Sequence, residues 1–160
     1  MKAALLPDRG VIKVAGNDAR NFLHGLVTTD ILHLQPGIAR FCALLTPQGK
    51  IIADFFVAEA PASDGGGFFL DLPRALAPTL IGKLNLYKLR AKLVIEDLSG
   101  TLGVMTAWAS VFDESGRKAL PSFVAVNLKD AAALGDITVH YAGEREPVPA
   151  EYYDLSLIHI

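Results

Sequence analysis

The chain has 160 residues, of which 51% are hydrophobic and 20% are charged, and its formal net charge is -2. This composition is typical of a folded globular domain and excludes an intrinsically disordered chain. A net charge so close to zero gives no electrostatic reason to expect nucleic acid or an anionic membrane as a partner. No apolar run reaches the ~20 residues that span a bilayer, and the first ten residues do not form a signal peptide. We therefore predict a soluble, cytoplasmic protein.

The first elements expected along the chain are a hairpin and a helix. Two short apolar runs, Ala3–Leu6 and Val11–Val14, flank a turn-forming Pro-Asp-Arg-Gly stretch, which predicts a β-hairpin. A helix should begin at Asp18, where the helix dipole favours a negative charge, with Asn17 capping the first turn. The apolar positions of this helix fall on one stripe and are Ala19, Phe22, Leu23 and Leu26.

The clearest strand pair follows at Ile38–Leu45 and Lys50–Ala58. Between them lies Thr-Pro-Gln-Gly, with Pro and Gly at the positions that a type I turn favours. The second strand is almost continuously apolar, which predicts burial on both faces. The single cysteine, Cys42, is interpreted as a small buried hydrophobe in the first strand.

The remaining segments alternate irregularly between strands and helices. After a strand at Phe68–Leu72, a helix should run from Pro73 to about Leu86. Lys88–Asp97 alternates apolar and basic residues and is predicted to be a strand with Lys88, Arg90 and Lys92 on one face. Later elements are expected as strands at Leu102–Trp108, Phe123–Val126 and Ile137–Tyr141 and a helix from Glu151. The fold class is therefore α+β, a largely antiparallel sheet with helices packed on it.

Asp54 is the most informative polar residue for chemistry. It lies within an apolar strand and shares a face with Ile52 and Phe56. A carboxylate there is costly to bury unless it finds a partner or a ligand that donates hydrogen bonds. The residues alone leave both explanations open. No metal site is predicted, because His24 and His33 lack further ligands at metal-binding spacing.

The stretch Val14–Asp30 reads V-x-G-x-D-A-x-x-F-L-x-x-L-x-T-x-D. It closely resembles the opening of the folate-binding family that contains the glycine-cleavage T-protein (GcvT) and the YgfZ-like iron–sulfur proteins. The resemblance continues through Pro36-Gly37, the LTPQGK turn at Leu45–Lys50, Asp54 and the LYKLRAKLV stretch at Leu86–Val94. It implies a GcvT/YgfZ-like N-terminal fold and tetrahydrofolate or a derivative as the cofactor.

The same resemblance implies the residues of the cofactor site. The family places an aspartate like Asp54 against the folate pterin, and a segment like Thr28, Thr29 and Asp30 at the edge of its folate cavity. The alternative for these three residues is a turn after the first helix, in which they satisfy local backbone groups. Likewise, the basic strip from Lys88 to Lys92 could meet a folate polyglutamate tail or a protein partner, or be an ordinary solvated face.

Two departures from the family pattern bear on function. The T-protein carries adjacent acidic residues where this chain has Ala53-Asp54, so only one carboxylate is present, and the YgfZ-like K-G-C-x-x-G-Q-E motif is absent. The resemblance therefore favours a folate-binding accessory protein for iron–sulfur cluster assembly or repair, with iron–sulfur client or assembly proteins as partners. The alternatives are a tetrahydrofolate-dependent aminomethyltransferase with Asp54 as its catalytic residue, or a truncated fragment without independent activity.

The end of the chain is interpreted separately. Residues 1–154 are expected to form a truncated folate-binding N-terminal region, with a sub-boundary near 97–103. Leu155–Ile160 reads LSLIHI, which matches a translated sequencing-adapter end, so we interpret it as a scar. The alternative is an ordinary amphipathic tail.

Overall fold

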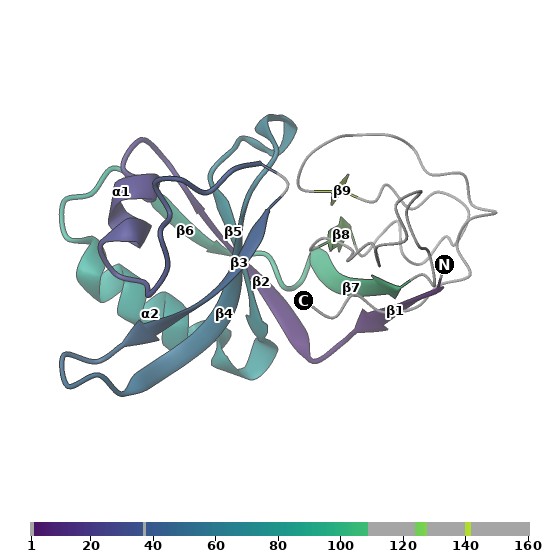
Figure 1. Ribbon diagram of the computed structural model, residues 1–160, viewed down its shortest axis with the longest axis horizontal. Helices are drawn as coiled ribbons and strands as arrows, with labels where there is room; N and C mark the ends of the chain where they lie inside the picture. The colour runs from purple at the N-terminus through teal and green to yellow at the C-terminus, as the bar shows by residue number, and fades with distance from the viewer. Residues whose placement is uncertain (1, 37, 109–123, 128–139, 142–160) are drawn as a thin grey trace, which may run out of the picture.

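The structure is a computed structural model that describes residues 2–36, 38–108, 124–127 and 140–141 (Figure 1). Its strands form two sheets. The larger sheet contains β2 (Arg9–Ala15), β3 (Ala39–Leu45), β4 (Ile51–Glu59), β5 (Phe68–Pro73) and β6 (Val94–Asp97). The smaller one contains β1 (Lys2–Leu6), β7 (Leu102–Trp108), β8 (Val124–Asn127) and β9 (His140–Tyr141). The helical segments are α1 (Ala19–His24), α2 (Ala77–Lys88) and the short 3₁₀ turns η1 (Ala62–Asp64) and η2 (Arg74–Leu76).

Every strand pair of the two sheets is antiparallel. The strand orders are β3-β4-β5-β2-β6 and β1-β7-β8-β9. The chain passes from the larger sheet to the smaller one between Asp97 and Leu102. The sub-boundary near 97–103 stays a prediction. Neither helix is long and apolar enough to cross a membrane in the part of the chain that is described.

The main hydrophobic core lies between the larger sheet and the two helices. Figure 1 shows α1 and α2 on the side of this sheet that faces away from β7. Leu23 of α1 and Leu80 of α2 are completely buried against Phe55 of β4 and its neighbours. A second, smaller cluster joins Val11, Phe69 and Val104, which belong to β2, β5 and β7. Because successive strand residues point to opposite faces, β2 contributes to both clusters.

The predicted hairpin of the first two strands is wrong. β1 pairs with β7, from Lys2 opposite Trp108 to Leu6 opposite Val104. β2 pairs instead with β5 and β6 in the other sheet. The turn at Pro7-Asp8 therefore carries the chain between two sheets. Turn composition predicts a change of direction, but the pairing partners come from distant segments of the chain.

The β3–β4 hairpin is confirmed. In its turn, the Gly49 N–H donates to the Thr46 carbonyl at 2.9 Å, and Gly49 has a φ of 80°, which favours glycine. The predicted burial of β4 on both faces is wrong along most of the strand. Ala53 and Phe55 are buried, whereas Asp54 is exposed. The strand therefore buries one face under the helices and exposes the other face to solvent. Near Ala58 the second cluster covers this other face.

The predicted strand at Lys88–Asp97 is also wrong over its first half. α2 continues to Lys88, Leu89 has a φ of 44°, and β6 begins only at Val94. The helix continues because its buried stripe of Leu80 and Leu84 extends toward Tyr87, which packs on the main core. Lys88, Arg90 and Lys92 therefore lie at a helix end and in a turn.

The other predicted strands at Phe68–Leu72 and Leu102–Trp108 correspond to β5 and β7, and the predicted helix after Pro73 corresponds to η2 and α2. The strands expected at Phe123–Val126 and Ile137–Tyr141 overlap β8 and β9. The helix predicted from Glu151 and the scar at 155–160 lie outside the described residues.

Gly16 lets α1 approach the turn before β6. Its φ is 132°, and a Cβ atom there would lie 2.5 Å from the Lys92 carbonyl oxygen and 2.6 Å from the Leu93 Cα. The Asp18 carboxylate accepts a hydrogen bond from the Lys92 N–H at 2.7 Å. Neither Asn17 nor Asp18 makes a side-chain cap on α1, so the predicted Asn17 cap is wrong. The Gly-x-Asp pattern instead joins two segments 74 residues apart.

Gly16→Ala should lower the free energy of unfolding by about 3 kcal/mol, because the new methyl group meets rigid backbone in a conformation that disfavours alanine. Gly82→Ala is the matched control, since a Cβ at Gly82 meets no atom within 4 Å. That helical substitution should stabilise the protein by about 0.5–1 kcal/mol. Urea denaturation of both variants measures the difference. Equal stability of the two would contradict the close approach at Gly16.

Candidate functional site

Thr28 and Asp54 lie on opposite sides of Ala43 in one row of the larger sheet. The Thr28 N–H donates to the Ala43 carbonyl at 3.1 Å, and the Thr28 Oγ1 accepts from the Ala43 N–H at 2.9 Å. Ala43 is in turn the cross-strand partner of Asp54. With neighbouring strands ~4.8 Å apart, the backbones of Thr28 and Asp54 are about 10 Å from each other. The structure therefore brings these two predicted site residues into one neighbourhood.

Asp30 belongs to a local turn. Its Oδ1 accepts from the Leu32 N–H at 2.9 Å, and its Oδ2 lies 2.6 Å from the His33 Nδ1. The His24 Nδ1 is 3.5 Å from Oδ1. The bond from His33 lowers the pKa of Asp30. This geometry is that of a side chain satisfying nearby groups. Thr29, which is half-buried, makes no side-chain hydrogen bond within the described ranges.

Arg20 of α1 bonds to the turn that follows Asp30. The sequence analysis did not single out this arginine. Its guanidinium donates to the Ile31 carbonyl at 2.7 Å and pairs with the carboxylate of Glu59 on β4. It also lies 5.0 Å from the ring centroid of Phe68. Arg20 thus fixes the loop between α1 and β3 to the sheet, and a charged residue at the flank of an amphipathic helix gives little signal for such a role.

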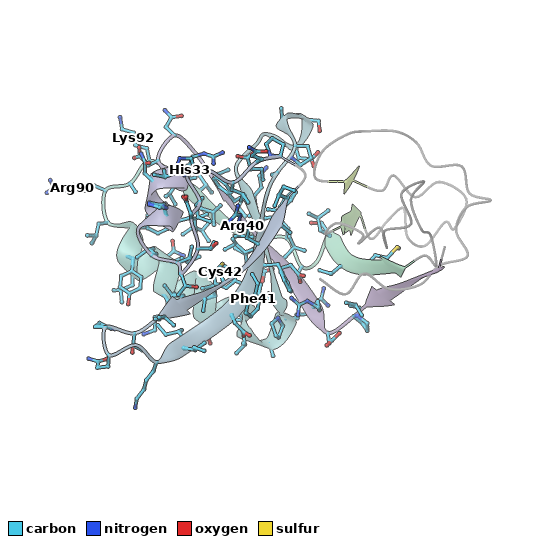
Figure 2. All side chains as sticks on the ribbon, in the orientation of Figure 1. His33, Arg40, Phe41, Cys42, Arg90 and Lys92 are labelled. Carbon is cyan, nitrogen blue, oxygen red and sulfur yellow. The ribbon has the colours of Figure 1, made fainter. Side chains whose placement is uncertain are left out.

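The Asp54 carboxylate is exposed and has neither a hydrogen bond nor an ion pair to any residue that the structure describes. Beside it on the same face, the Phe56 ring lies 5.2 Å from that of Phe41, its cross-strand partner. Phe41 is 59% exposed, and Figure 2 labels its position. The face around Asp54 therefore combines a free carboxylate with the accessible ring of Phe41 and the half-buried ring of Phe56.

An ion pair with a buried carboxylate lies next to this face. Asp71 of β5 is 3% exposed and is the cross-strand partner of Phe56. The Arg9 Nε donates to the Asp71 Oδ1 at 2.6 Å, and the guanidinium lies 5.9 Å from the Phe56 ring centroid. Burial raises the pKa of Asp71, and Arg9 opposes that rise. The only sequence signal for this pair is one acid inside the apolar run at Phe68–Leu72.

Arg9→Met should lower the free energy of unfolding by about 2 kcal/mol at neutral pH, because it leaves a buried carboxylate unpaired. Without Arg9 the pKa of Asp71 should rise further above its usual 3.8. A raised folded-state pKa favours the neutral acid in the folded protein. Below pH 3.8 the carboxyl is neutral in both states, and its burial does not lower the free energy of unfolding. As the pH rises through the folded-state pKa of Asp71, the free energy of unfolding falls.

The deficit of Arg9→Met relative to the parent chain should therefore grow from acid to neutral pH in urea denaturation. Arg40→Met removes an exposed arginine from β3 and is the control, with an expected change within about 0.5 kcal/mol. A deficit that stays constant between pH 4 and pH 7 would contradict the coupling between Arg9 and Asp71.

Cys42 faces the main core, as predicted, and is 2% exposed. Burial raises the pKa of its thiol to about 12, so the thiol is neutral at physiological pH and is a poor nucleophile. In the described ranges, no three His, Cys, Asp or Glu side chains are grouped so that they could hold a metal ion. Cys42 therefore acts in packing.

The Cys42 thiol should not react with a water-soluble aromatic disulfide reagent in the native protein at pH 8. It should react completely in guanidinium chloride, because unfolding exposes the thiol and returns its pKa to the ordinary range. Absorbance of the released thiolate measures this directly, since the chain has one cysteine. Rapid stoichiometric reaction of the folded chain would contradict the burial.

Comparisons with known proteins report both sequence and fold similarity. No family model matches the chain. The protein named iron-sulfur cluster assembly factor IBA57 homolog, mitochondrial, from Mycosarcoma maydis is 35% identical over 118 residues, covering 68% of this chain and 29% of that protein. The protein of the same name from Phaeosphaeria nodorum is 29% identical over 165 residues, covering 95% of this chain and 39% of that protein. The chain thus spans between a quarter and two fifths of the length of such relatives.

Among solved structures, the glycine cleavage system aminomethyltransferase T from Bartonella henselae matches with a TM-score of 0.57 and 18% identity. The match covers 66% of this chain and 28% of that chain. At this identity the likeness shows the fold, and it confirms the prediction of a GcvT-like antiparallel sheet with helices. The relatives' names agree with the iron–sulfur part of the predicted function, whereas the YgfZ-like assignment and folate binding stay predictions.

Proposed function

We propose that this chain forms part of an iron–sulfur cluster assembly factor and binds a folate-type ligand on the face that carries Asp54. The observation that supports the first part is the similarity to proteins named as such factors, which extends over 68% of the chain at 35% identity. The second part is supported by the aminomethyltransferase-like fold and by the free carboxylate on this face.

The groups around Asp54 suit a flat heteroaromatic ring that carries N–H donors. The exposed ring of Phe41, with Phe56 beside it, offers a surface for stacking. Asp54 supplies an acceptor with four lone-pair directions for amino and ring N–H groups. The Thr28 hydroxyl accepts one backbone bond and can still donate its own proton. A pterin ring, as in tetrahydrofolate or its derivatives, presents this combination of a flat face and N–H donors.

The structure changes the weight of one argument against transferase chemistry. Ala53, which replaces the neighbouring acid of the T-protein pattern, is 1% exposed and faces the helices. Asp54 lies on the opposite face, so an acid at position 53 would not stand beside it. An aminomethyltransferase with Asp54 assisting proton movement is therefore the second candidate, and the fold likeness favours it. Formation of a methylene-folate product from an aminomethyl donor would distinguish it from a binding protein.

The location follows from the same relatives. Their names describe mitochondrial proteins, and we propose the mitochondrion as the place of action, while the cytoplasmic location stays a prediction of the sequence alone. Iron–sulfur client or assembly proteins are the proposed partners, on the basis of the relatives' names.

Isothermal titration of tetrahydrofolate into the 160-residue chain tests the ligand. Saturable binding is expected, and Asp54→Asn should weaken it about tenfold or more, because a charge-assisted hydrogen bond contributes ~1.5–3 kcal/mol. Glu96→Gln removes an exposed carboxylate from β6, at the far edge of the sheet, and should bind like the parent chain.

Equal weakening by both substitutions would remove Asp54 from the site. Absence of binding to the parent chain would contradict a folate site within these residues and favour a fragment without independent activity. Neither result bears on the iron–sulfur role, which is tested separately by complementing a strain that lacks its own IBA57-type factor with a full-length gene that contains this sequence.

A further inference from the structure

Two leucines project from the end of α2 and the turn that follows it. Leu86 is 64% exposed and Leu89 is 88% exposed. Lys83 lies one turn before Leu86 on the same side of the helix. Large apolar side chains with this exposure contribute little to folding, because they remain in water in the folded state. Their packing within this chain therefore does not explain them.

The backbone at Leu89 is strained as well. Its φ of 44° and ψ of -104° place it outside the regions that a leucine favours, and no other described non-glycine residue has a positive φ. Glycine adopts a positive φ at the end of a helix with the lowest conformational energy, because it has no Cβ. Strained backbone positions concentrate at binding sites, where the conformation that presents a side chain matters more than its cost. Here the strain presents an apolar side chain to solvent.

Basic side chains surround these leucines. Lys88, Arg90 and Lys92 follow each other at alternate positions, and Lys83 precedes them on the helix. Figure 2 shows Arg90 and Lys92 at the end of the molecule farthest from the smaller sheet, with their side chains directed outward. The four cations form no ion pair with the carboxylates of the described ranges. The nearby Asp18 carboxylate accepts a hydrogen bond from the Lys92 backbone.

We propose that this surface, formed by Leu86, Leu89 and the four basic residues around them, docks an acidic segment of a partner protein. We call it the basic-leucine surface. Carboxylates of the partner would meet the cations, and an apolar side chain would cover Leu89. Complementary charge steers such an encounter, and the central apolar contact supplies affinity once water is excluded. The proposal does not depend on folate binding, because Asp54 lies on a different face of the molecule.

A protein partner fits this surface better than nucleic acid or a membrane. The chain as a whole has a net charge of -2, so its total charge does not attract a polyanion such as nucleic acid or an anionic bilayer. Nucleic-acid surfaces interleave exposed aromatic rings with basic residues, whereas the large apolar side chains exposed here, Leu86 and Leu89, are aliphatic. An anionic bilayer attracts a larger positive field and a longer apolar face than two leucines provide.

The test measures fluorescence anisotropy of a labelled amphipathic helical peptide of Glu, Ala and Leu, titrated with the parent chain at low salt. Saturable binding is expected, and Arg90→Glu/Lys92→Glu should weaken it about tenfold or more. Arg40→Glu/Lys50→Glu changes the net charge equally at exposed positions on β3 and its turn and should have no more than a twofold effect. A peptide with Gln in place of Glu should not bind.

Leu89→Gly separates docking from folding. It should weaken peptide binding about threefold or more and, at the same time, raise the melting temperature, because glycine relieves the strained backbone and little buried surface is lost. The proposal is overturned if the parent chain does not bind the acidic peptide, or if both charge-reversal pairs weaken binding equally. It is also overturned if single-stranded RNA or phosphatidylserine vesicles bind at Arg90 and Lys92 while the peptide does not.

Discussion

The backbone of Gly16 passes so close to Lys92 and Leu93 that no side chain fits between them. Two residues further on, the Asp18 carboxylate bonds to the Lys92 N–H and fixes the start of α1 against the turn before β6. This contact sets where α1 lies on the sheet, and Arg20 then ties the loop after α1 to β4. Thr28 reaches the edge of β3 as a consequence. The position of the candidate ligand face therefore depends on one close backbone approach near the start of the chain.

The larger sheet has two different faces because β2 lies at the junction of the two sheets. Its inner residues pack under the helices. Of its outer residues, Val11 meets Val104 of β7, and Arg9 pairs with the buried Asp71 of β5. Among the described residues, nothing of this kind covers the outer face near β3 and β4, which carries Asp54, Phe41 and Phe56. The proposed ligand site therefore combines apolar rings with a carboxylate beside them.

The sequence predicted local structure correctly where turn chemistry and apolar patterning decide it. The turn of Thr46 to Gly49, the β3–β4 hairpin and the buried Cys42 follow from turn residues and apolar patterning alone. It failed where partners are distant in the chain, as in the supposed hairpin of β1 with β2. It also failed at Lys88–Asp97, where alternation resembled a strand while the buried stripe of α2 continued the helix. Within the candidate site, Asp54 was singled out as an acid inside an apolar strand and Thr28 only through the family resemblance, and the role of both stays a prediction. Asp71 and Arg9 were missed.

By itself, the sequence determined the α+β class, the positions of most strands and the motif string that resembles the GcvT family, because these depend on composition, periodicity and local turns. Only the tertiary structure decided that Gly16 and Asp18 serve the contact with Lys92, that Ala53 lies on the buried face of β4 and Asp54 on the exposed one, and that Leu89 is presented to solvent. Each of these depends on which distant segment lies against a given residue. Such neighbours are fixed by the packing of the whole sheet, which no local pattern records.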